Sequence, residues 1–239
     1  MGKIHWTRGW ARGAFHVHRL LRANYRDFDH HNKKNPLDNL LFILCSVKTT
    51  ESNYSQTYSL LKQKYPKFVD LLAATQSEIA SVIKRGGLSK QKAKCIKGII
   101  LRLDRRFGHP TLSPLRHLSD EECESFLVSL PGVGKKVARC VMMIPLGRHV
   151  FPVDTHCWRI SKRLGWINQT RNDGYCSPSE MDRLQGLIPP HLRRSMHLNM
   201  VSLGREYCTP SFPKCNECPI SRMCARIGVD QSNNSPTCR

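Results

Sequence analysis

Leu130-Pro131-Gly132-Val133-Gly134-Lys135-Lys136 is the stretch that decides the fold of this 239-residue chain. Two glycines on either side of one apolar residue allow a tight hairpin that exposes backbone N–H groups. The residues that follow form an apolar stripe at helical spacing, namely Val137, Cys140, Val141 and Ile144. A glycine turn that leads into a helix N-terminus predicts a phosphate site. A Gly-x-Gly turn alone more often has a structural role, but the flanking Leu-Pro and Lys-Lys pairs favour a phosphate site here.

The helical periodicity extends from this hairpin over residues 37–148. Apolar side chains recur three and four positions apart in residues 58–83 and again in residues 96–103, and strand-type alternation is nearly absent. Pro36 marks a boundary before this region. We therefore predict an all-α fold, with one or two domains for a chain of this length.

The charge balance indicates a polyanionic partner. The chain has 38 Lys and Arg against 18 Asp and Glu, a net charge of +20, and a neutral metabolite would not need that surplus. Residues 84–106 hold nine basic residues against one acid, Asp104. An amphipathic helix with a basic outer face there would suit a DNA backbone. A surface that serves only solubility is the alternative in both cases.

Membrane attachment and secretion are not expected. No stretch reaches the roughly 18 apolar residues of a membrane span. The N-terminus is basic and lacks an apolar core of signal-peptide length. We expect the cytoplasm of a prokaryote or the nucleus of a eukaryote.

A group of cysteines near the C-terminus predicts a metal site. Eleven cysteines without a secretion signal argue against a disulfide framework. Four of them form the pattern C-x6-C-x2-C-x5-C, namely Cys208, Cys215, Cys218 and Cys224. Four thiolates so close in sequence describe a tetrahedral site for zinc or for a [4Fe–4S] cluster. Zinc usually takes two C-x2-C pairs, and this segment has one.

Several motifs in the same order and spacing resemble one family. The hairpin resembles that of the helix-hairpin-helix (HhH-GPD) DNA glycosylases, the superfamily that includes endonuclease III. The resemblance continues through Gly87-Leu88, through Phe151-Pro152-Val153-Asp154-Thr155-His156 and through the C-terminal cysteines. It covers most of residues 37–224. The uneven cysteine spacing resembles the [4Fe–4S] cluster loop of the endonuclease III branch.

The resemblance implies a two-part glycosylase fold. Residues 37–151 would form a helical domain that carries the helix-hairpin-helix motif. Residues 1–36 together with 152–239 would form a second helical domain, with the cluster loop at residues 208–224. The implied DNA-binding residues are Lys48, Leu88, Gly132, Val133, Gly134 and Lys135.

Lys136 and Asp154 are the catalytic residues that the resemblance implies. Lys136 matches the nucleophile of bifunctional members, a lysine in the second position after the Gly-x-Gly turn. Lys135 and Lys136 point about 100° apart on a helix, so only one can face a cleft. A carboxylate at Asp154 would stabilise the oxocarbenium-like state of glycosidic cleavage. Local sequence alone favours a helix N-cap at Asp154, and both roles can coexist.

Base recognition is implied at two positions. Leu88 matches the wedge that enters the base stack when a nucleotide is flipped, and a core leucine is the alternative. Lys48 stands where the family often places a glutamine that fills the vacated space. This departure leaves the opposite base, and hence the preferred lesion, open.

The implied function is a bifunctional DNA glycosylase/AP lyase of base excision repair. It would act as a monomer on double-stranded DNA, flip a damaged or modified pyrimidine, and attack the sugar C1′ to form a Schiff base before β-elimination. Similarity to endonuclease III indicates oxidised pyrimidines. Residues 151–166 and 204–224 also resemble plant 5-methylcytosine glycosylases, and mismatch-specific thymine or uracil glycosylases share the same parts. The adenine-glycosylase branch is disfavoured because Lys136 would have no role there. A non-enzymatic DNA-binding module with zinc, or an RNA-acting protein, is the alternative of another class.

Overall fold

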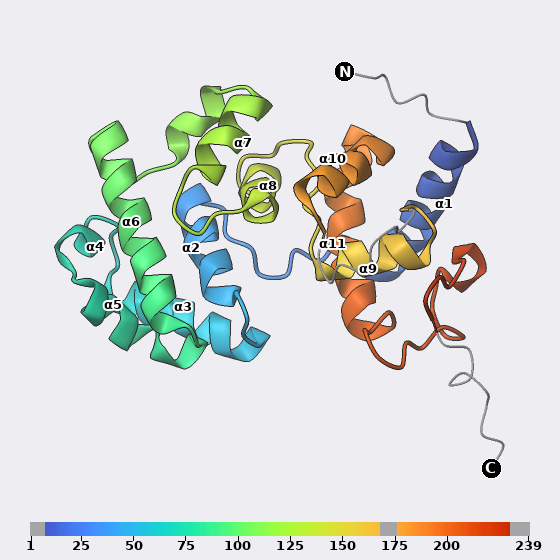
Figure 1. Cartoon of the computed structure of the whole chain (residues 1–239), viewed down its shortest axis with the longest axis horizontal. Coiled ribbons are helices and arrows are strands. Elements are labelled where there is room, and N and C mark those ends of the chain that lie inside the picture. The colour runs from blue at the N-terminus through green and yellow to red at the C-terminus, as the bar shows by residue number, and fades with distance from the viewer. Residues whose placement is uncertain (1–7, 168–175, 230–239) are drawn as a thin grey trace, which may run out of the picture. The chain divides into compact units, whose positions relative to one another are not determined.

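The computed structural model describes residues 8–167 and 176–229, and these residues form helices and loops without a strand (Figure 1). The all-α prediction is confirmed. The backbone divides into two compact units. We call residues 31–148 the hairpin unit, and residues 1–30 with 149–239 the cysteine unit. The parts of the predicted second domain at residues 1–7, 168–175 and 230–239 lie outside the described residues. None of the described helices is long and apolar enough to cross a membrane.

The hairpin unit is built around helix α2. Its helices are α2 (Pro36–Ser46), α3 (Glu51–Lys64), α4 (Asp70–Ala73), α5 (Gln76–Val82), α6 (Ser89–Phe107), α7 (Asp120–Val128) and α8 (Lys135–Met143), with the 3-10 turns η1 (Lys84–Gly86) and η2 (Ser113–His117). The Asn35 side chain caps α2, and Pro36 occupies its first turn. An apolar run from Leu40 to Cys45 is buried on every side, because α2 packs against α3, α6 and α8.

Helix α6 carries the predicted apolar stripe. Its inner face is fully buried at Ile96, Ile99, Ile100 and Leu103. Gly108 ends the helix in the left-handed conformation, with φ +75°. The stripe holds α6 against α2, α4 and α5, so that its other side is available for charged residues.

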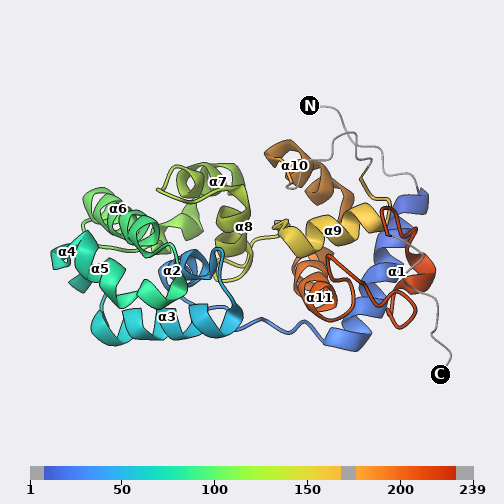
Figure 2. The same cartoon turned by 60° about the horizontal axis from the view of Figure 1, so that its bottom comes forward.

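The cysteine unit contains the first and the last of the described helices and turns. Its helices are α1 (Arg8–Tyr25), α9 (Thr155–Arg163), α10 (Pro178–Leu187) and α11 (Arg193–Glu206), with the 3-10 turns η3 (Pro190–Leu192) and η4 (Ser221–Met223). Helix α11 packs against both α1 and α9 (Figure 2). Fully buried side chains from these elements form one core, including Leu21, Phe151, Leu184, Met196 and Leu203.

Capping boxes define where three of the helices begin. In each box a hydroxyl accepts from the third backbone N–H of the helix while a glutamate reaches back to the cap. The pairs are Thr75 with Glu78 at α5, Ser119 with Glu122 at α7, and Ser177 with Glu180 at α10.

Candidate functional site

The glycine hairpin is packed tightly on helix α6. Leu130 and Val133 are buried, and the Val133 N–H donates to the carbonyl of Leu130 at 3.1 Å. Gly132 has φ +74°, and a Cβ built on it would lie 2.6 Å from Sγ of Cys95. Glycine is therefore required at this position by both conformation and space. The Val133 side chain anchors the turn from below, while Gly132 and Gly134 are exposed.

Helix α8 begins directly at the hairpin, as the apolar stripe predicts. Gly134 is its N-cap, and no side chain caps this start among the described residues. Backbone N–H groups of a first helical turn point out of the helix end, where they favour anions. The start of α8, directly after the exposed Gly132 and Gly134, thus has the geometry expected of a phosphate site.

Lys135 and Lys136 are neighbours in the first turn of α8. The Lys135 ammonium lies 3.3 Å from Oε1 of Glu124 on α7. Arg139, one helical turn further, binds the other oxygen of the same carboxylate through Nε at 2.7 Å. Glu124 therefore holds the Lys135 side chain against α7, whereas half-buried Lys136 occupies the next position around the helix.

Leu88 lies on the surface of the hairpin unit. Its side chain is 47% exposed, and it caps α6 in the left-handed conformation with φ +49°. The alternative that Leu88 is a core leucine is wrong. A bulky residue in this conformation stores strain, which is common where a side chain has a binding role.

Lys48 lies in the turn between α2 and α3 and shares this backbone conformation. Its φ is +50°, and its side chain is exposed. Lys48 and Leu88 therefore both stand on short turns of the hairpin unit, each in the left-handed region. Gly87, with φ +67°, lies directly before Leu88.

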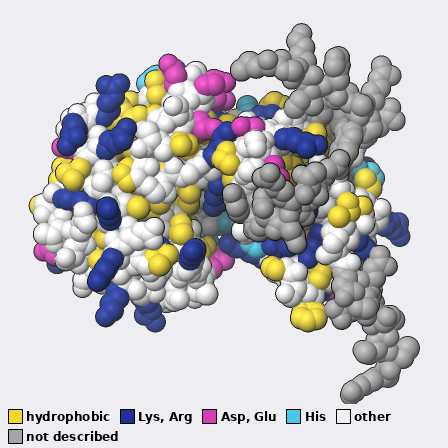
Figure 3. Space-filling view, in the orientation of Figure 1, with side chains coloured by type: hydrophobic (Ala, Val, Ile, Leu, Met, Phe, Trp, Pro, Cys, Tyr) yellow, Lys and Arg dark blue, Asp and Glu magenta, His cyan; other side chains and the backbone are white. Residues whose placement is uncertain are grey.

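The basic segment of residues 84–106 differs in part from the expected outer face. Seven of its nine basic side chains reach solvent, namely Lys84, Arg85, Lys90, Lys94, Arg102, Arg105 and Arg106. Figure 3 shows basic side chains over α6, whereas acidic side chains gather over α7. Lys92 and Lys97 turn inward onto backbone carbonyls, because the amphipathic helix places them on its packed flank.

Asp154 is the N-cap of α9 in the cysteine unit. Its Oδ1 accepts from the N–H of Cys157 at 2.8 Å, and its side chain is half-buried. Burial lowers the pKa of the neighbouring His156 imidazole, and the Asp154 carboxylate opposes this shift. Nη2 of Arg159 lies 3.0 Å from Nδ1 of the same ring. The N-cap that the local sequence favours is present.

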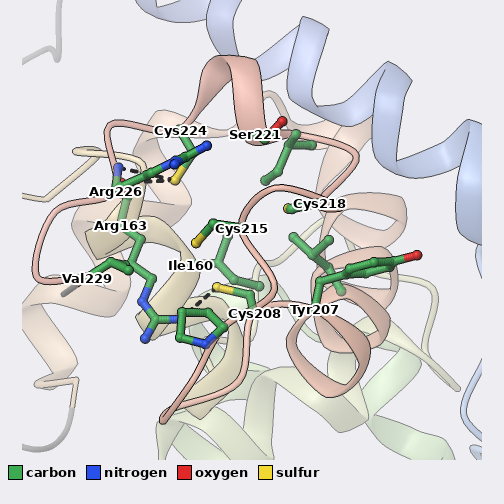
Figure 4. A pocket seen from close by; sticks show the side chains of 13 residues that line it. Ile160, Arg163, Tyr207, Cys208, Cys215, Cys218, Ser221, Cys224, Arg226 and Val229 are labelled. Atoms are coloured by element: carbon green, nitrogen blue, oxygen red, sulfur yellow. Dashed lines mark hydrogen bonds between the residues drawn. The ribbon is translucent and has the colours of Figure 1, made fainter. Parts of the chain in front are cut away.

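All four cysteines of the C-terminal pattern line one pocket (Figure 4). Cys208 follows α11, and Cys224 directly follows η4. Figure 4 shows the sulfurs of Cys208, Cys215 and Cys224 turned toward a common space. The other residues that line the pocket include the apolar Ile160 and Leu203 and the basic Arg163 and Arg226.

Arg163, the last residue of α9, holds both ends of this cysteine loop. Its Nη1 donates to Sγ of Cys208 at 3.1 Å and to the carbonyl of Thr209 at 2.8 Å. Its own carbonyl accepts from Sγ of Cys224 at 3.3 Å. One turn earlier, Arg159 donates from Nε to the carbonyl of Cys208 at 2.7 Å. Two arginines of one helix thus fix the start of the loop.

The donors around these sulfurs suit thiolate ligands. Besides the Arg163 guanidinium, the backbone N–H of Arg226 points at Sγ of Cys224 at 3.4 Å. Burial raises the pKa of Cys218 to about 11, and the neighbouring cysteines add to the shift. Metal binding would displace these thiol protons. Among the described residues no group of three or more His, Cys, Asp or Glu is arranged to hold a metal ion, but four thiols around one pocket, with cationic and amide donors, fit a thiolate-ligated cluster.

Sequence reasoning missed three basic residues that bind backbone carbonyls of distant segments. Arg159 and Arg163 bind the cysteine loop, and Lys92 binds the ends of α2 and η1. Arg159 and Arg163 are spaced i, i+4 on α9, which is a signal that both lie on one face. Their acceptors in the cysteine loop are 45–49 residues away in sequence, so no local pattern identifies them. For Lys92, the only sequence signal of an inward side chain is its position beside the apolar stripe of α6.

Comparisons with known proteins agree with this geometry. Residues 43–184 match the family model of the HhH-GPD superfamily base excision DNA repair proteins. Endonuclease III of Thermotoga maritima is 31% identical over 195 residues, which are 81% of this chain and 84% of that protein. An Arabidopsis thaliana protein named as a DNA glycosylase is 40% identical over 171 residues. That match is 71% of this chain, and the chain spans only about half (56%) of the Arabidopsis relative.

A solved structure has the same fold. It is a trapped covalent intermediate of endonuclease III with DNA, with a TM-score of 0.76 at 25% sequence identity. The match covers 92% of this chain and 96% of the other.

Proposed function

Because this chain belongs to the HhH-GPD superfamily of base excision DNA repair proteins, we propose that it is a bifunctional DNA glycosylase/AP lyase. The resemblance to this superfamily is confirmed by the membership, and the matched residues 43–184 include the hairpin and the Asp154 segment. The substrate we propose is double-stranded DNA that carries a damaged or modified pyrimidine. The protein would act as a monomer, in a prokaryotic cytoplasm or a eukaryotic nucleus.

The place of Lys136 in the first turn of α8, directly after the glycine hairpin, carries the proposal. Glu124 binds the Lys135 ammonium and so directs that side chain toward α7. Lys136 is the second residue of α8. It therefore lies at the N-terminal end of the helix, directly after the exposed glycines of the hairpin. A phosphate bound at the hairpin would bring a sugar of the same strand near the first turn of α8. We therefore assign the role of nucleophile to the Lys136 amine.

The proposed reaction forms one bond as another breaks. The neutral Lys136 amine attacks the sugar C1′, and the bond from C1′ to the base breaks, with its electron pair leaving on the base as the base takes up a proton. Loss of the amine proton and ring opening give a Schiff base between Nζ and C1′. Removal of a proton from C2′ then expels the 3′ phosphate by β-elimination, and water releases Lys136.

Asp154 has the role of charge stabiliser in this scheme. Glycosidic cleavage develops positive charge at the sugar, which a carboxylate stabilises. The N-cap contact to Cys157 fixes one of its oxygens, and this orients the carboxylate without a change in its charge. Capping and catalysis therefore use the same side chain.

The cysteine loop is proposed to hold a [4Fe–4S] cluster. Its ligands would be the four pocket-lining thiolates, Cys208, Cys215, Cys218 and Cys224. The cluster would cross-link the loop and thereby order its backbone. Lys214 and Arg222 lie in the same loop, and we propose that they contact DNA phosphates.

Strand incision on defined duplexes tests this function. Each duplex carries one thymine glycol, one T:G or U:G mismatch, one 5-methylcytosine or one abasic site. We expect incision at thymine glycol and at the abasic site. Incision of a mismatch and the abasic site, but of no other duplex, would reassign the protein to the mismatch-specific glycosylases. Incision of 5-methylcytosine and the abasic site alone would reassign it to the 5-methylcytosine glycosylases. Lys48, in place of the family's frequent glutamine, is the observation that keeps these alternatives open.

Tight DNA binding without incision of any duplex would contradict the lyase part of the proposal and leave a monofunctional glycosylase or a DNA-binding module, and only the glycosylase releases a free base. The metal then separates the two classes independently. Iron and sulfide in purified protein support the cluster, whereas zinc without iron supports the binding module.

A further inference from the structure

A buried lysine lies beneath the two turns that carry Lys48 and Leu88. Lys92 of α6 is 5% exposed. Its Nζ donates to the carbonyl of Cys45, in the last turn of α2, and to the carbonyl of Gly86, at the end of η1. Both distances are 2.8 Å. One ammonium group therefore joins two segments that are 41 residues apart in sequence, from residue 45 to residue 86.

An ammonium in this position is costly for the fold. Burial lowers the pKa of Lys92, since desolvation disfavours the charged form. The hydrogen bonds of its Nζ in the described residues both go to backbone carbonyls, and an apolar side chain of similar length would avoid the desolvation penalty. The gain is that the last carbonyls of α2, which lack helical partners, receive a charged donor.

The two acceptors lie directly before the two strained turns. Cys45 is three residues before Lys48, and Gly86 is two residues before Leu88. Both Lys48 and Leu88 have positive φ and exposed side chains. A backbone in this conformation persists only where its surroundings fix it. Lys92 supplies such a fixed point at the base of each turn.

The turn at residue 86 has one further anchor, on α3. A Cβ built on Gly86 would lie 2.8 Å from Oγ1 of Thr57, which is itself buried. This close packing fixes the distance between the turn at Gly86 and helix α3. The hydrogen bonds of Lys92 supply its connection to the end of α2, and thus to the turn that carries Lys48.

We infer that Lys92 is a positioning residue that couples the wedge at Leu88 to the turn that carries Lys48. This inference rests on the proposed function, in which Leu88 enters the base stack and Lys48 meets the space left by the flipped base. A flexible wedge would lose part of its insertion energy to ordering, whereas a turn held on both sides is ordered before DNA arrives. Lys92 itself touches neither the DNA nor the reacting atoms.

Lys97 provides a matched control on the same helix. Its Nζ also donates to two backbone carbonyls, of Leu71 at 3.1 Å and of Leu72 at 2.5 Å. These acceptors belong to α4, whereas the acceptors of Lys92 lie beside the turns that carry Lys48 and Leu88. Lys97→Met removes an ammonium from a similar pair of backbone acceptors, at a half-buried position. The comparison with Lys92→Met therefore separates loop coupling from the general loss of a lysine.

The first measurement is amide hydrogen exchange in the free, full-length protein. We expect faster exchange in residues 46–48 and 87–90 of Lys92→Met and unchanged exchange there in Lys97→Met. Equal exchange of these segments in wild type and Lys92→Met would overturn the coupling. This test needs no DNA, so it is independent of the proposed function.

The second measurement is single-turnover excision of thymine glycol. Displacement of a binding group lowers rates, and we expect the excision rate of Lys92→Met to fall by up to about tenfold, the loss expected when the Leu88 side chain is removed. Lys97→Met should remain within about twofold of wild type. In a Leu88→Ala background, Lys92→Met should have little further effect, because coupled residues are not additive. Fully additive losses would contradict a role through Leu88.

Lys92→Arg covers the case in which Lys92→Met does not fold. It keeps the positive charge and two donors, and we expect wild-type exchange in both turns and near wild-type excision. If the turns stay protected in Lys92→Arg while excision falls as far as in Leu88→Ala, the coupling account is overturned. Absence of excision by the wild-type protein would reject the proposed function, and hydrogen exchange would then decide on Lys92 alone.

Discussion

Arg163 donates from Nη1 to the sulfur of Cys208 at 3.1 Å, while its own carbonyl accepts from the sulfur of Cys224 at 3.3 Å. One residue at the end of α9 therefore contacts the first and the last cysteine of the loop. A cationic donor to a ligand sulfur stabilises the thiolate and fixes its direction. Asp154 is the N-cap of the same helix, so the candidate catalytic carboxylate lies at one end of α9 and an anchor of the cysteine loop at the other.

Arg163→Gln should weaken retention of the proposed cluster. Loss of such an outer contact typically lowers metal affinity about 10- to 100-fold. The measurement is iron per protein during exposure to a chelator, followed by visible absorbance. Arg222→Gln, which removes an exposed arginine of the same loop, should lose iron at the wild-type rate. Equal retention of iron in Arg163→Gln and wild type would contradict the role of this contact.

The sequence predicts the helices but not every direction of their side chains. The stripe from Ile96 to Leu103 identifies α6 because apolar spacing determines which face is buried. The same stripe cannot show that Lys92 and Lys97 turn inward, because a long side chain at the edge of a packed face can reach either solvent or a carbonyl. Their acceptors lie on other helices, and only the tertiary fold brings them within reach.

The family resemblance and the all-α class are confirmed, whereas the roles of the site residues stay predictions. Leu88 illustrates the difference. An apolar residue after a glycine fits a core position or a surface turn equally well, and only the tertiary structure shows that Leu88 is exposed. At Asp154 the local sequence predicts a cap, and the cap is present. Its proposed chemistry depends on DNA.

Leu88→Ala should reduce base excision without loss of stability. The exposed side chain contributes little to the core, so the free energy of unfolding should change by less than about 0.5 kcal/mol. Loss of roughly 1.4 kcal/mol of wedge contact would slow excision tenfold. Leu101→Ala removes a comparably exposed leucine (43%) from α6 and serves as control. Excision by Leu88→Ala at the rate of Leu101→Ala would count against the wedge.

Gly132→Ala should destabilise the protein, in contrast to Gly134→Ala. A left-handed conformation costs a residue with a Cβ roughly 1–2 kcal/mol, and at Gly132 the new Cβ would also collide with Cys95. Gly134 has φ −90°, and a Cβ added there would meet no atom within 4 Å. Denaturant unfolding measures both. Cys95→Ala should recover only part of the Gly132→Ala loss, because it relieves the collision and leaves the backbone strain. Complete recovery would show that the backbone conformation costs nothing.

Asp154→Asn should separate the cap from the proposed catalysis. Asparagine caps helices about as well as aspartate, so thermal stability should stay near wild type, whereas Asp154→Ala should lose about 1 kcal/mol. Base excision by Asp154→Asn should fall about 100-fold, the usual scale for loss of one charge-stabilising group. Schiff-base formation at a preformed abasic site should fall less, since the base has already left. Wild-type excision by Asp154→Asn would restrict Asp154 to capping.

Borohydride trapping on a duplex with a single abasic site tests the central claim most directly. Wild type, Lys136→Gln and Lys135→Gln are compared under conditions in which all three bind the duplex. We predict a covalent adduct with wild type and with Lys135→Gln, and none with Lys136→Gln. Loss of the Lys135 ammonium should not matter, because Glu124 holds that group against α7 in the wild type. Trapping by Lys136→Gln at the wild-type level, or loss of trapping in Lys135→Gln alone, would contradict the assignment of Lys136 as the nucleophile.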